Sequence, residues 1–279
     1  MGVVFHSDPE AFASAANPVA KRSPSSEAFV AIWCAGLRNH PPAAGVPWLL
    51  ATADVDGALA LAMQHGVNPV LLEHGDPAAV RAIAHALADA GLEVPGVHGA
   101  EAACAAFAEV WRERRGVGTA ERVRLRHHVL ESVSPVSTPA GAMRVADADD
   151  LEWLVEALDA FIDEAKVPAA PQGTARMVEQ RVADRRFRVW EDGGIVAFLG
   201  AHLIDGGYAR IGPVYTPRPR RGRGYATALV AAASRELIER GARHVFLTTD
   251  VANPVSNAIY ARVGFRPVDD MVAFDFVAP

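Results

Sequence analysis

The 279-residue chain is poor in the features that mark several large classes of protein. It has two cysteines, Cys34 and Cys104, which are too few for a disulfide framework and typical of a reducing compartment. No apolar run is as long as a membrane span, and no secretory signal peptide is recognisable. We therefore expect a cytoplasmic protein that does not associate with a membrane.

Motifs for metal and covalent chemistry are also missing. The ten histidines are scattered, with no H-E-x-x-H and no zinc-type Cys/His spacing, so no metal site is expected. There is no G-x-S-x-G, and the cysteines lack a recognisable set of catalytic partners. The net charge of −6 argues against nucleic acid as a partner. Hydrophobic residues make up 51% of the chain, enough for sizeable cores.

The most informative stretch is residues 221–226, Arg-Gly-Arg-Gly-Tyr-Ala. It follows a strand-like run at 209–216 and opens a long helical pattern. A glycine-rich turn at a helix N-terminus collects unpaired N–H groups at the positive end of the helix dipole. Such a place binds anions, and phosphate groups are common occupants. The sequence therefore predicts a phosphate-bearing cofactor.

Two familiar phosphate sites fit these residues only in part. A P-loop needs Gly-Lys-Ser or Gly-Lys-Thr, which is absent. A dinucleotide-binding turn is matched by Gly222 and Gly224, but Thr227 stands where its third small residue belongs. Asp250 ends the next strand, where the ribose-binding acid of a dinucleotide site would stand. The long basic linker at 217–220 argues against a tight dinucleotide turn.

A third pattern, R-x-x-G-x-A, is satisfied by Arg221, Gly224 and Ala226. It resembles the acetyl-CoA-binding signature of the GNAT superfamily of N-acetyltransferases. A second motif of that superfamily follows the next strand: an Asn, a short helix that carries a Tyr, and a Gly-Phe pair. Its residues here are Asn253, Asn257, Tyr260, Gly264 and Phe265. The two motifs in this order favour the GNAT interpretation, which covers about residues 141–279.

The resemblance implies a GNAT-like acyl-CoA N-acyltransferase fold in the C-terminal half. This α/β fold is a mixed sheet with helices on both faces. The hydrophobic periodicity agrees. It predicts strands at 142–146, 187–191, 195–204, 208–216, 245–249 and 265–276, and helices at 149–163, 173–183, 224–240 and 254–263.

A Ser- and Pro-rich linker at 132–141 predicts two domains, 1–138 and 139–279. The first contains three strands, a helix, a strand, a helix and a strand, in the order of the C-terminal half. We expect a degenerate GNAT-like α/β domain, with an unrelated α/β domain as the alternative. Residues 73–77, Glu-His-Gly-Asp-Pro, stand where its phosphate seat would be and should not hold a diphosphate. Its predicted strands are 48–52, 58–63, 69–73, one near 97 and 123–130, with helices at 77–90, 101–114 and within 8–40.

The resemblance also implies which residues form the site. The pantetheine arm of acetyl-CoA would enter a gap beside 214–216, and Gly212-Pro213 in that strand suits an irregular strand. Tyr260 is the implied general acid; the alternative is that its ring only packs against the sheet. The implied cofactor-binding residues are Val214, Tyr215, Thr216, Arg221, Gly222, Arg223, Gly224, Tyr225, Ala226, Thr227, Asn253 and Asn257.

The implied function is acetyl-CoA-dependent N-acetylation. A primary amine of a small molecule or peptide would attack acetyl-CoA, the co-substrate, directly in a ternary complex. A backbone N–H near 214–216 would stabilise the oxyanion. His202, Asp163, Glu164 or a water chain could serve as the base. Two alternatives stay open: a non-catalytic acyl-CoA-binding sensor and a dinucleotide-dependent oxidoreductase.

Overall fold

The computed structural model describes residues 2–39, 48–66, 68–167, 173–204 and 206–278. It divides the chain into two compact units. The first unit contains residues 1–128, 248–253 and 267–279, and the second contains 129–247 and 254–266. The chain first passes from one unit to the other after residue 128, close to the predicted domain boundary near residue 138. A single boundary, however, does not describe a chain whose C-terminal segment returns to the first unit.

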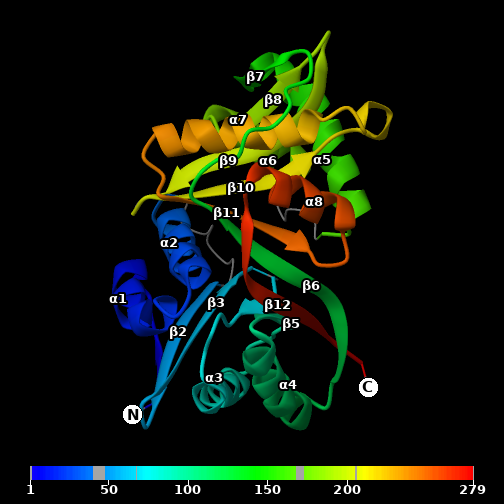
Figure 1. The fold of residues 1–279 in the computed structure, drawn as a ribbon. Coiled ribbons are helices and arrows are strands. Elements are labelled where there is room, and N and C mark those ends of the chain that lie inside the picture. The colour runs from blue at the N-terminus through cyan, green and yellow to red at the C-terminus, as the bar shows by residue number, and fades with distance from the viewer. Residues whose placement is uncertain (1, 40–47, 67, 168–172, 205, 279) are drawn as a thin grey trace. The chain divides into compact units, whose positions relative to one another are not determined.

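The helices and strands follow one order twice (Figure 1). The first series is β1 (Val3–Phe5), α1 (Pro9–Ala20), α2 (Pro24–Asn39), β2 (Trp48–Val55), β3 (Ala58–His65), β4 (Val70–Leu71), α3 (Pro77–Asp89), β5 (Gly96–Gly99), α4 (Glu101–Arg115) and β6 (Gly118–Leu130). The second is β7 (Ala142–Val145), α5 (Leu151–Ala165), α6 (Thr174–Ala183), β8 (Phe187–Glu191), β9 (Ile195–Ile204), β10 (Tyr208–Tyr215), α7 (Tyr225–Glu239), β11 (His244–Asp250), α8 (Pro254–Val263) and β12 (Arg266–Val277). The predicted repeat is confirmed, and it includes β1, which the sequence did not predict.

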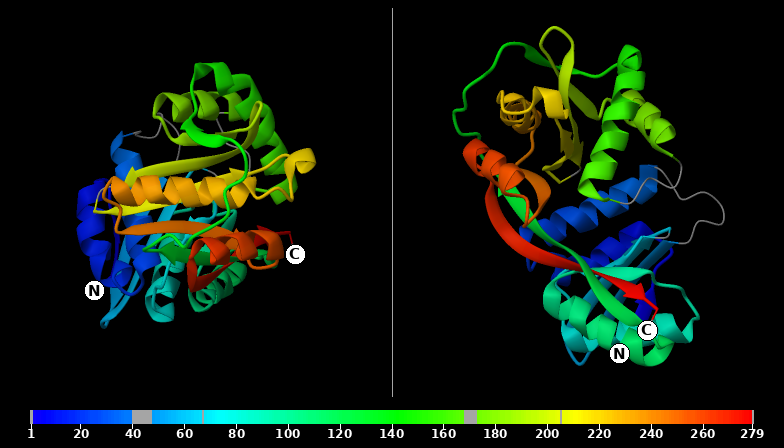
Figure 2. Two further views of the ribbon diagram at one scale, coloured as in Figure 1. Left: turned by 45° about the horizontal axis from the view of Figure 1, so that its top comes forward. Right: turned by 90° about the vertical axis from the view of Figure 1, so that its right-hand side faces the viewer.

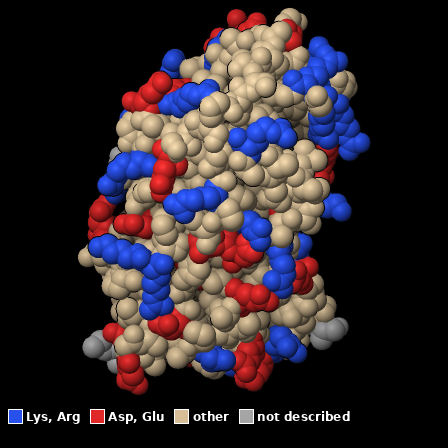
Figure 3. All heavy atoms as spheres, in the orientation of Figure 1, with Lys and Arg blue, Asp and Glu red and all other residues tan. Residues whose placement is uncertain are grey.

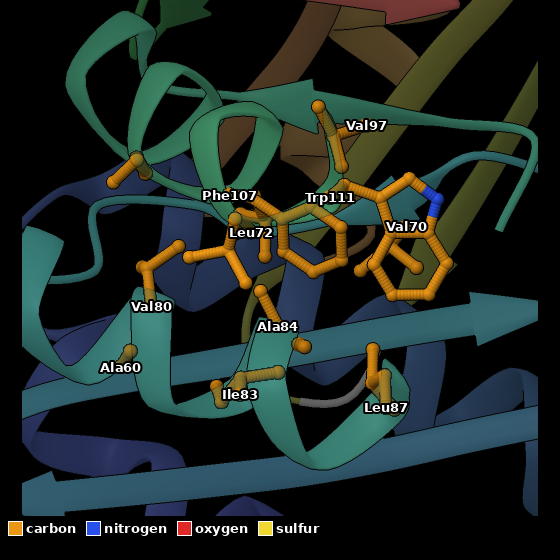
Figure 4. Packing of buried hydrophobic residues seen from close by; sticks show 14 of the residues in the cluster. Ala60, Val70, Leu72, Val80, Ile83, Ala84, Leu87, Val97, Phe107 and Trp111 are labelled. Atoms are coloured by element: carbon orange, nitrogen blue, oxygen red, sulfur yellow. The ribbon is translucent and has the colours of Figure 1, made fainter. Parts of the chain in front are cut away.

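In the first unit the strand order is β1-β2-β3-β4-β5-β12-β6. Side chains alternate between two cores, as the period of a strand requires. On β3, Ala60 and Ala62 face the core under α3 and α4, whereas Leu61 and Met63 face the core under α1 and α2. Figure 4 shows the first of these cores, where the two helices meet the sheet through Ala60, Val70, Leu72, Val80, Ile83, Ala84, Leu87, Val97, Phe107 and Trp111.

In the second unit the order is β11-β10-β9-β8-β7, with β10 and β11 parallel and the other pairs antiparallel. Helix α7 lies along β9 and β10 (Figure 2). It packs Leu229 and Ala233 onto one face of the sheet, and α5 packs Leu154 and Leu158 onto the other. The predicted mixed sheet with helices on both faces is confirmed.

The C-terminal strand β12 belongs to the first unit apart from its first residue. It pairs antiparallel with β5, with Val272 opposite Gly99 and Phe274 opposite Val97. Val272 is buried in the core under α3 and α4. The last strand of the second series therefore completes the core of the first unit.

Acidic and basic side chains are interspersed on the face drawn in Figure 3. Several arginines form ion pairs within one unit, such as Arg126 with Asp270 in the first and Arg144 with Asp150 in the second. Both cysteines are buried, and burial raises the pKa of Cys34 to about 11. Among the described residues, no helix is both long and apolar enough to span a membrane.

A buried polar cluster joins three parts of the first unit. Ser26 Oγ donates to Glu73 Oε2 at 2.6 Å, and His74 Nε2 lies 3.1 Å from Asp269 Oδ1. Burial would raise the pKa of Asp269, but hydrogen bonds from His74, Ser23 and Ser25 outweigh it, so this pKa is lowered. The side chain of Glu73 is inaccessible to solvent, and burial raises its pKa from 4.5 to about 7.

Glu73 should make stability depend on pH. Because folding raises its pKa, Glu73 stabilises the folded state fully below pH 4.5, and this contribution is lost as the pH rises through about 7. Glu73→Gln should remove about 2–3 kcal/mol of the fall in unfolding free energy between pH 5 and pH 8. Urea denaturation at both pH values measures this. An equal fall in both proteins would contradict the assignment.

Candidate functional site

The predicted phosphate seat is the turn between β10 and α7. After a 3-10 turn at Arg218–Arg220, Gly222 and Gly224 adopt φ values of 78° and 85°. A Cβ built on either glycine would meet nothing within 4 Å. Gly224 is the N-cap of α7, and its carbonyl accepts the first helical bond from Ala228. The N–H groups of residues 225–227 therefore precede the helical ladder and have no carbonyl acceptor within the helix.

Strand β10, which leads to this seat, pairs with its parallel neighbour β11 over only its first residues. In the described parts of both strands, β10 pairs with β11 at Tyr208, Ala209 and Arg210 only. The remainder of β10 pairs with β9, with a register shift between Ile211 and Val214 around a cis Gly212–Pro213 bond. Among the described residues, no strand thus pairs with the backbone groups of residues 211–215 that point away from β9. The resemblance implies that a pantetheine arm would enter a gap at this position, which stays a prediction.

Thr216 stands between this gap and the seat. Its Oγ1 is buried and has no hydrogen-bond partner among the described residues. A buried hydroxyl without a partner costs free energy, so such an atom marks a place where a polar ligand would be stabilised. Thr216 was predicted as a cofactor-binding residue, and its geometry suits that role.

The side chain of Arg221, by contrast, is already engaged within the protein. Its Nη2 donates to Glu164 Oε2 at 2.9 Å, and its Nε donates to the Thr216 carbonyl oxygen at 2.8 Å. Glu164 lies in the last turn of α5 and also accepts a hydrogen bond from the Tyr215 hydroxyl at 2.8 Å. The sequence suggested Glu164 only as a possible base and contained no signal for these contacts.

Several predicted cofactor-binding residues turn their side chains into the protein. Tyr225 is buried and donates its hydroxyl to Asp192, in the turn between β8 and β9. Thr227 is also buried, and Val214 packs against the core under α7. Only their backbone groups can face the seat or the gap. Arg223 and Ala226 lie at the turn itself, the first exposed and the second half-buried.

The second motif lies on and just before α8. Tyr260 is buried among apolar residues, its ring edge-on to Phe265 at 5.9 Å, and burial raises the pKa of its hydroxyl. Asn257 lies one turn earlier on the same helix. Asn253, in the first unit, donates its N–H to the Asp250 carbonyl oxygen, and Asp250 Oδ1 accepts from Ala252 N. The acid that a dinucleotide site would need is thus part of a local turn.

The three suggested bases differ in character. Burial, together with nearby arginines, lowers the pKa of His202 to about 3, so its imidazole is a weak base. A hydrogen bond from Arg221, helped by those from Tyr215 and Arg218, lowers the pKa of Glu164. Asp163 is exposed near the end of α5. Within the described residues, no group of three or more His, Cys, Asp or Glu is placed to hold a metal ion.

The corresponding region of the first unit is closed. Beyond the pairs of β4 with β5, Leu72 N donates to His98 O at 2.9 Å and Ala100 N donates to Glu73 O at 3.3 Å. The two backbones stay so close that a Cβ on Gly99 would lie 3.0 Å from Glu73 N. At the N-terminus of α3, the Asp76 carboxylate accepts from Leu59 N and Arg22. A negative charge thus stands at the N-cap residue of α3, where it would repel a phosphate.

Part of the chain, including the turn between β10 and α7, matches the sequence model of a known protein family. Residues 152–265 match the sequence model of the acetyltransferase (GNAT) family. The match includes the seat, the gap and Tyr260, and it leaves the first unit outside apart from residues 248–253. A comparison with curated protein sequences gives no significant match.

Solved structures resemble the chain over nearly its whole length. A GCN5-related N-acetyltransferase from Sphaerobacter thermophilus has a TM-score of 0.66 at 16% identity, covering 99% of this chain and 96% of the other. A GNAT-family acetyltransferase from Colwellia psychrerythraea gives 0.63 at 12% identity, covering 99% and 100%. A tandem GNAT protein from the clavulanic acid biosynthesis pathway gives 0.59 at 16% identity, covering 99% and 98%. At these identities the likeness concerns the fold, and it includes the repeated order of elements.

Proposed function

Residues 152–265 form a domain of the acetyltransferase (GNAT) family, and from this premise we propose that the protein is an acetyl-CoA-dependent N-acetyltransferase. The observation that carries the proposal is the open turn at Gly222 and Gly224, directly after a strand that has left its parallel neighbour. The turn suits a diphosphate, and the gap suits an extended amide-bearing arm. A cytoplasmic location would agree with the two buried, unpaired cysteines.

The residues present fit the proposed co-substrate. The N–H groups of residues 225–227 and the exposed Arg223 would bind the diphosphate at the positive end of the α7 dipole. Backbone groups of residues 214–216 would bind the pantetheine arm, and Thr216 Oγ1 would gain the partner it lacks. Acetyl-CoA supplies an activated thioester to this site.

The chain's own groups would then assist transfer to a primary amine of a small molecule or peptide. An N–H near Val214 to Thr216 would stabilise the negative charge that develops on the carbonyl oxygen. Tyr260, which burial keeps protonated, would deliver a proton to the sulfur as the C–S bond breaks. The described residues contain no strongly basic candidate among those suggested, which favours water as the acceptor of the amine proton.

A panel of amines, amino acids and peptides, assayed for release of free CoA thiol, tests the proposal. Release that depends on one class of amine supports transferase activity. Binding of acetyl-CoA without turnover of any amine would instead support the acyl-CoA-binding sensor. Thermal stabilisation by a nicotinamide dinucleotide but not by acetyl-CoA would contradict both.

We predict one acetyl-CoA site per chain. In the first unit, backbone hydrogen bonds continue beyond β4 and β5 through Leu72 and Glu73, and the Asp76 carboxylate at the N-cap of α3 would repel a phosphate. Calorimetric titration of the full chain should therefore give a stoichiometry near one. A second site that survives disruption of the seat at Gly224 would show that the first unit also binds the co-substrate.

A further inference from the structure

We propose that Glu164 competes with phosphate-bearing ligands for Arg221, beside the predicted phosphate seat: Glu164 accepts a hydrogen bond from Arg221, and binding of such a ligand displaces it. The inference rests on the proposed function, since it concerns the same seat. Glu164 Oε2 accepts from Arg221 Nη2 at 2.9 Å, and Oε1 accepts from the Tyr215 hydroxyl at 2.8 Å. The more exposed Arg218 also approaches Oε1, at 3.4 Å.

The guanidinium of Arg221 makes three contacts within the protein, of which the one with Glu164 is described above. Its guanidinium lies over the Tyr215 ring, 5.5 Å from the ring centroid, while Nε donates to the Thr216 carbonyl oxygen. Arg221 donates to the Glu164 carboxylate through Nη2 alone, and a guanidinium N–H binds the oxygens of a phosphate as well as those of a carboxylate. Arg221, the arginine of the R-x-x-G-x-A pattern, can reach a ligand phosphate through Nη2 only after Glu164 has left.

Replacement of the Glu164 carboxylate by a ligand phosphate at Arg221 should cost little free energy. The side chains of Arg221 and Glu164 are 45% and 28% exposed, so water can replace either partner. Ion pairs this exposed are weak, whereas the diphosphate of CoA carries two negative charges against the single charge of the Glu164 carboxylate. Glu164 would thus lower the affinity of the seat without preventing binding. Its return to Arg221 would promote release of the CoA product.

Glu164→Gln tests the proposal, because glutamine keeps the shape and an acceptor for Tyr215 but removes the charge. Glu156→Gln is the matched control, an exposed carboxylate earlier on the same helix. Titration with CoA should give roughly 1.5- to fivefold tighter binding to Glu164→Gln, as expected for loss of an exposed competing pair. Glu156→Gln should bind as the unmodified protein does. In the background of Arg221→Ala, the gain from Glu164→Gln should vanish.

A spectroscopic measurement follows the displacement directly. The chain has four tyrosines, so ring-labelled tyrosine gives few signals. Glu164→Gln should shift the Tyr215 signal in the free protein, and saturating CoA should shift it in the unmodified protein. Equal or weaker CoA binding by Glu164→Gln, or a Tyr215 signal that CoA leaves unchanged, would overturn the competitor role. Absence of CoA binding in every variant, the unmodified protein included, would instead refute the proposed function.

Discussion

Replacing Gly224 with aspartate is expected to abolish acetyl-CoA binding. A Cβ at this position points into open space, so the new carboxylate would occupy the phosphate seat. Two like charges about 4 Å apart near a protein surface repel by about 4 kcal/mol. An affinity on the order of micromolar would therefore weaken about a thousandfold, beyond ordinary detection by calorimetry.

A matched control separates charge in the seat from backbone strain. Gly57, in the turn between β2 and β3, has φ of 87°, close to the 85° of Gly224, and equally open space. Gly57→Asp should thus cost similar stability and leave acetyl-CoA binding intact. If Gly224→Asp also bound acetyl-CoA normally, the seat would not be the diphosphate site.

Replacing Tyr260 with phenylalanine should lower kcat by roughly a hundredfold or more, the range of a general acid. The proton is needed only as the thiolate leaves, so kcat and kcat/KM should fall together. Acetyl-CoA affinity should change little. Steady-state kinetics with an accepted amine, together with calorimetry, measures both quantities.

Tyr208→Phe is the corresponding control, because Tyr208 is also buried and stacks on His244 in the same unit. Comparable melting temperatures of the two variants would exclude unfolding as the cause of a lower rate. A fully active Tyr260→Phe protein would make Tyr260 a packing residue beside Phe265 and assign the proton to water.

The local elements of this protein were largely predictable. The helix expected at 77–90 is observed at Pro77–Asp89, and the strand expected at 195–204 is observed at Ile195–Ile204. Such elements follow from periodic burial and from turn residues, which act within a few residues of the chain. The short strand β1 lacks both signals, since it has three residues and depends on pairing with β2 for its existence.

The candidate site likewise has features that follow from local sequence and features that depend on contacts between distant residues. The positive φ of Gly222 and Gly224 and the start of α7 follow from the sequence of one turn. The contact of Glu164 with Arg221 joins residues 57 positions apart. No local rule specifies which carboxylate will meet that arginine, because the packing of α5 against β10 decides it.

By itself the sequence determined the repeated order of elements, and it predicted the phosphate seat and the candidate acid Tyr260, because each of these features depends on short runs of residues. Only the tertiary structure decided that β12 completes the first unit beside β5, that the Asp76 carboxylate binds Leu59 N and Arg22, and that Glu164 binds Arg221. Strand pairing and ion pairing between distant segments depend on where the whole chain places their backbones. That placement is a property of the assembled cores, which no single stretch of sequence contains.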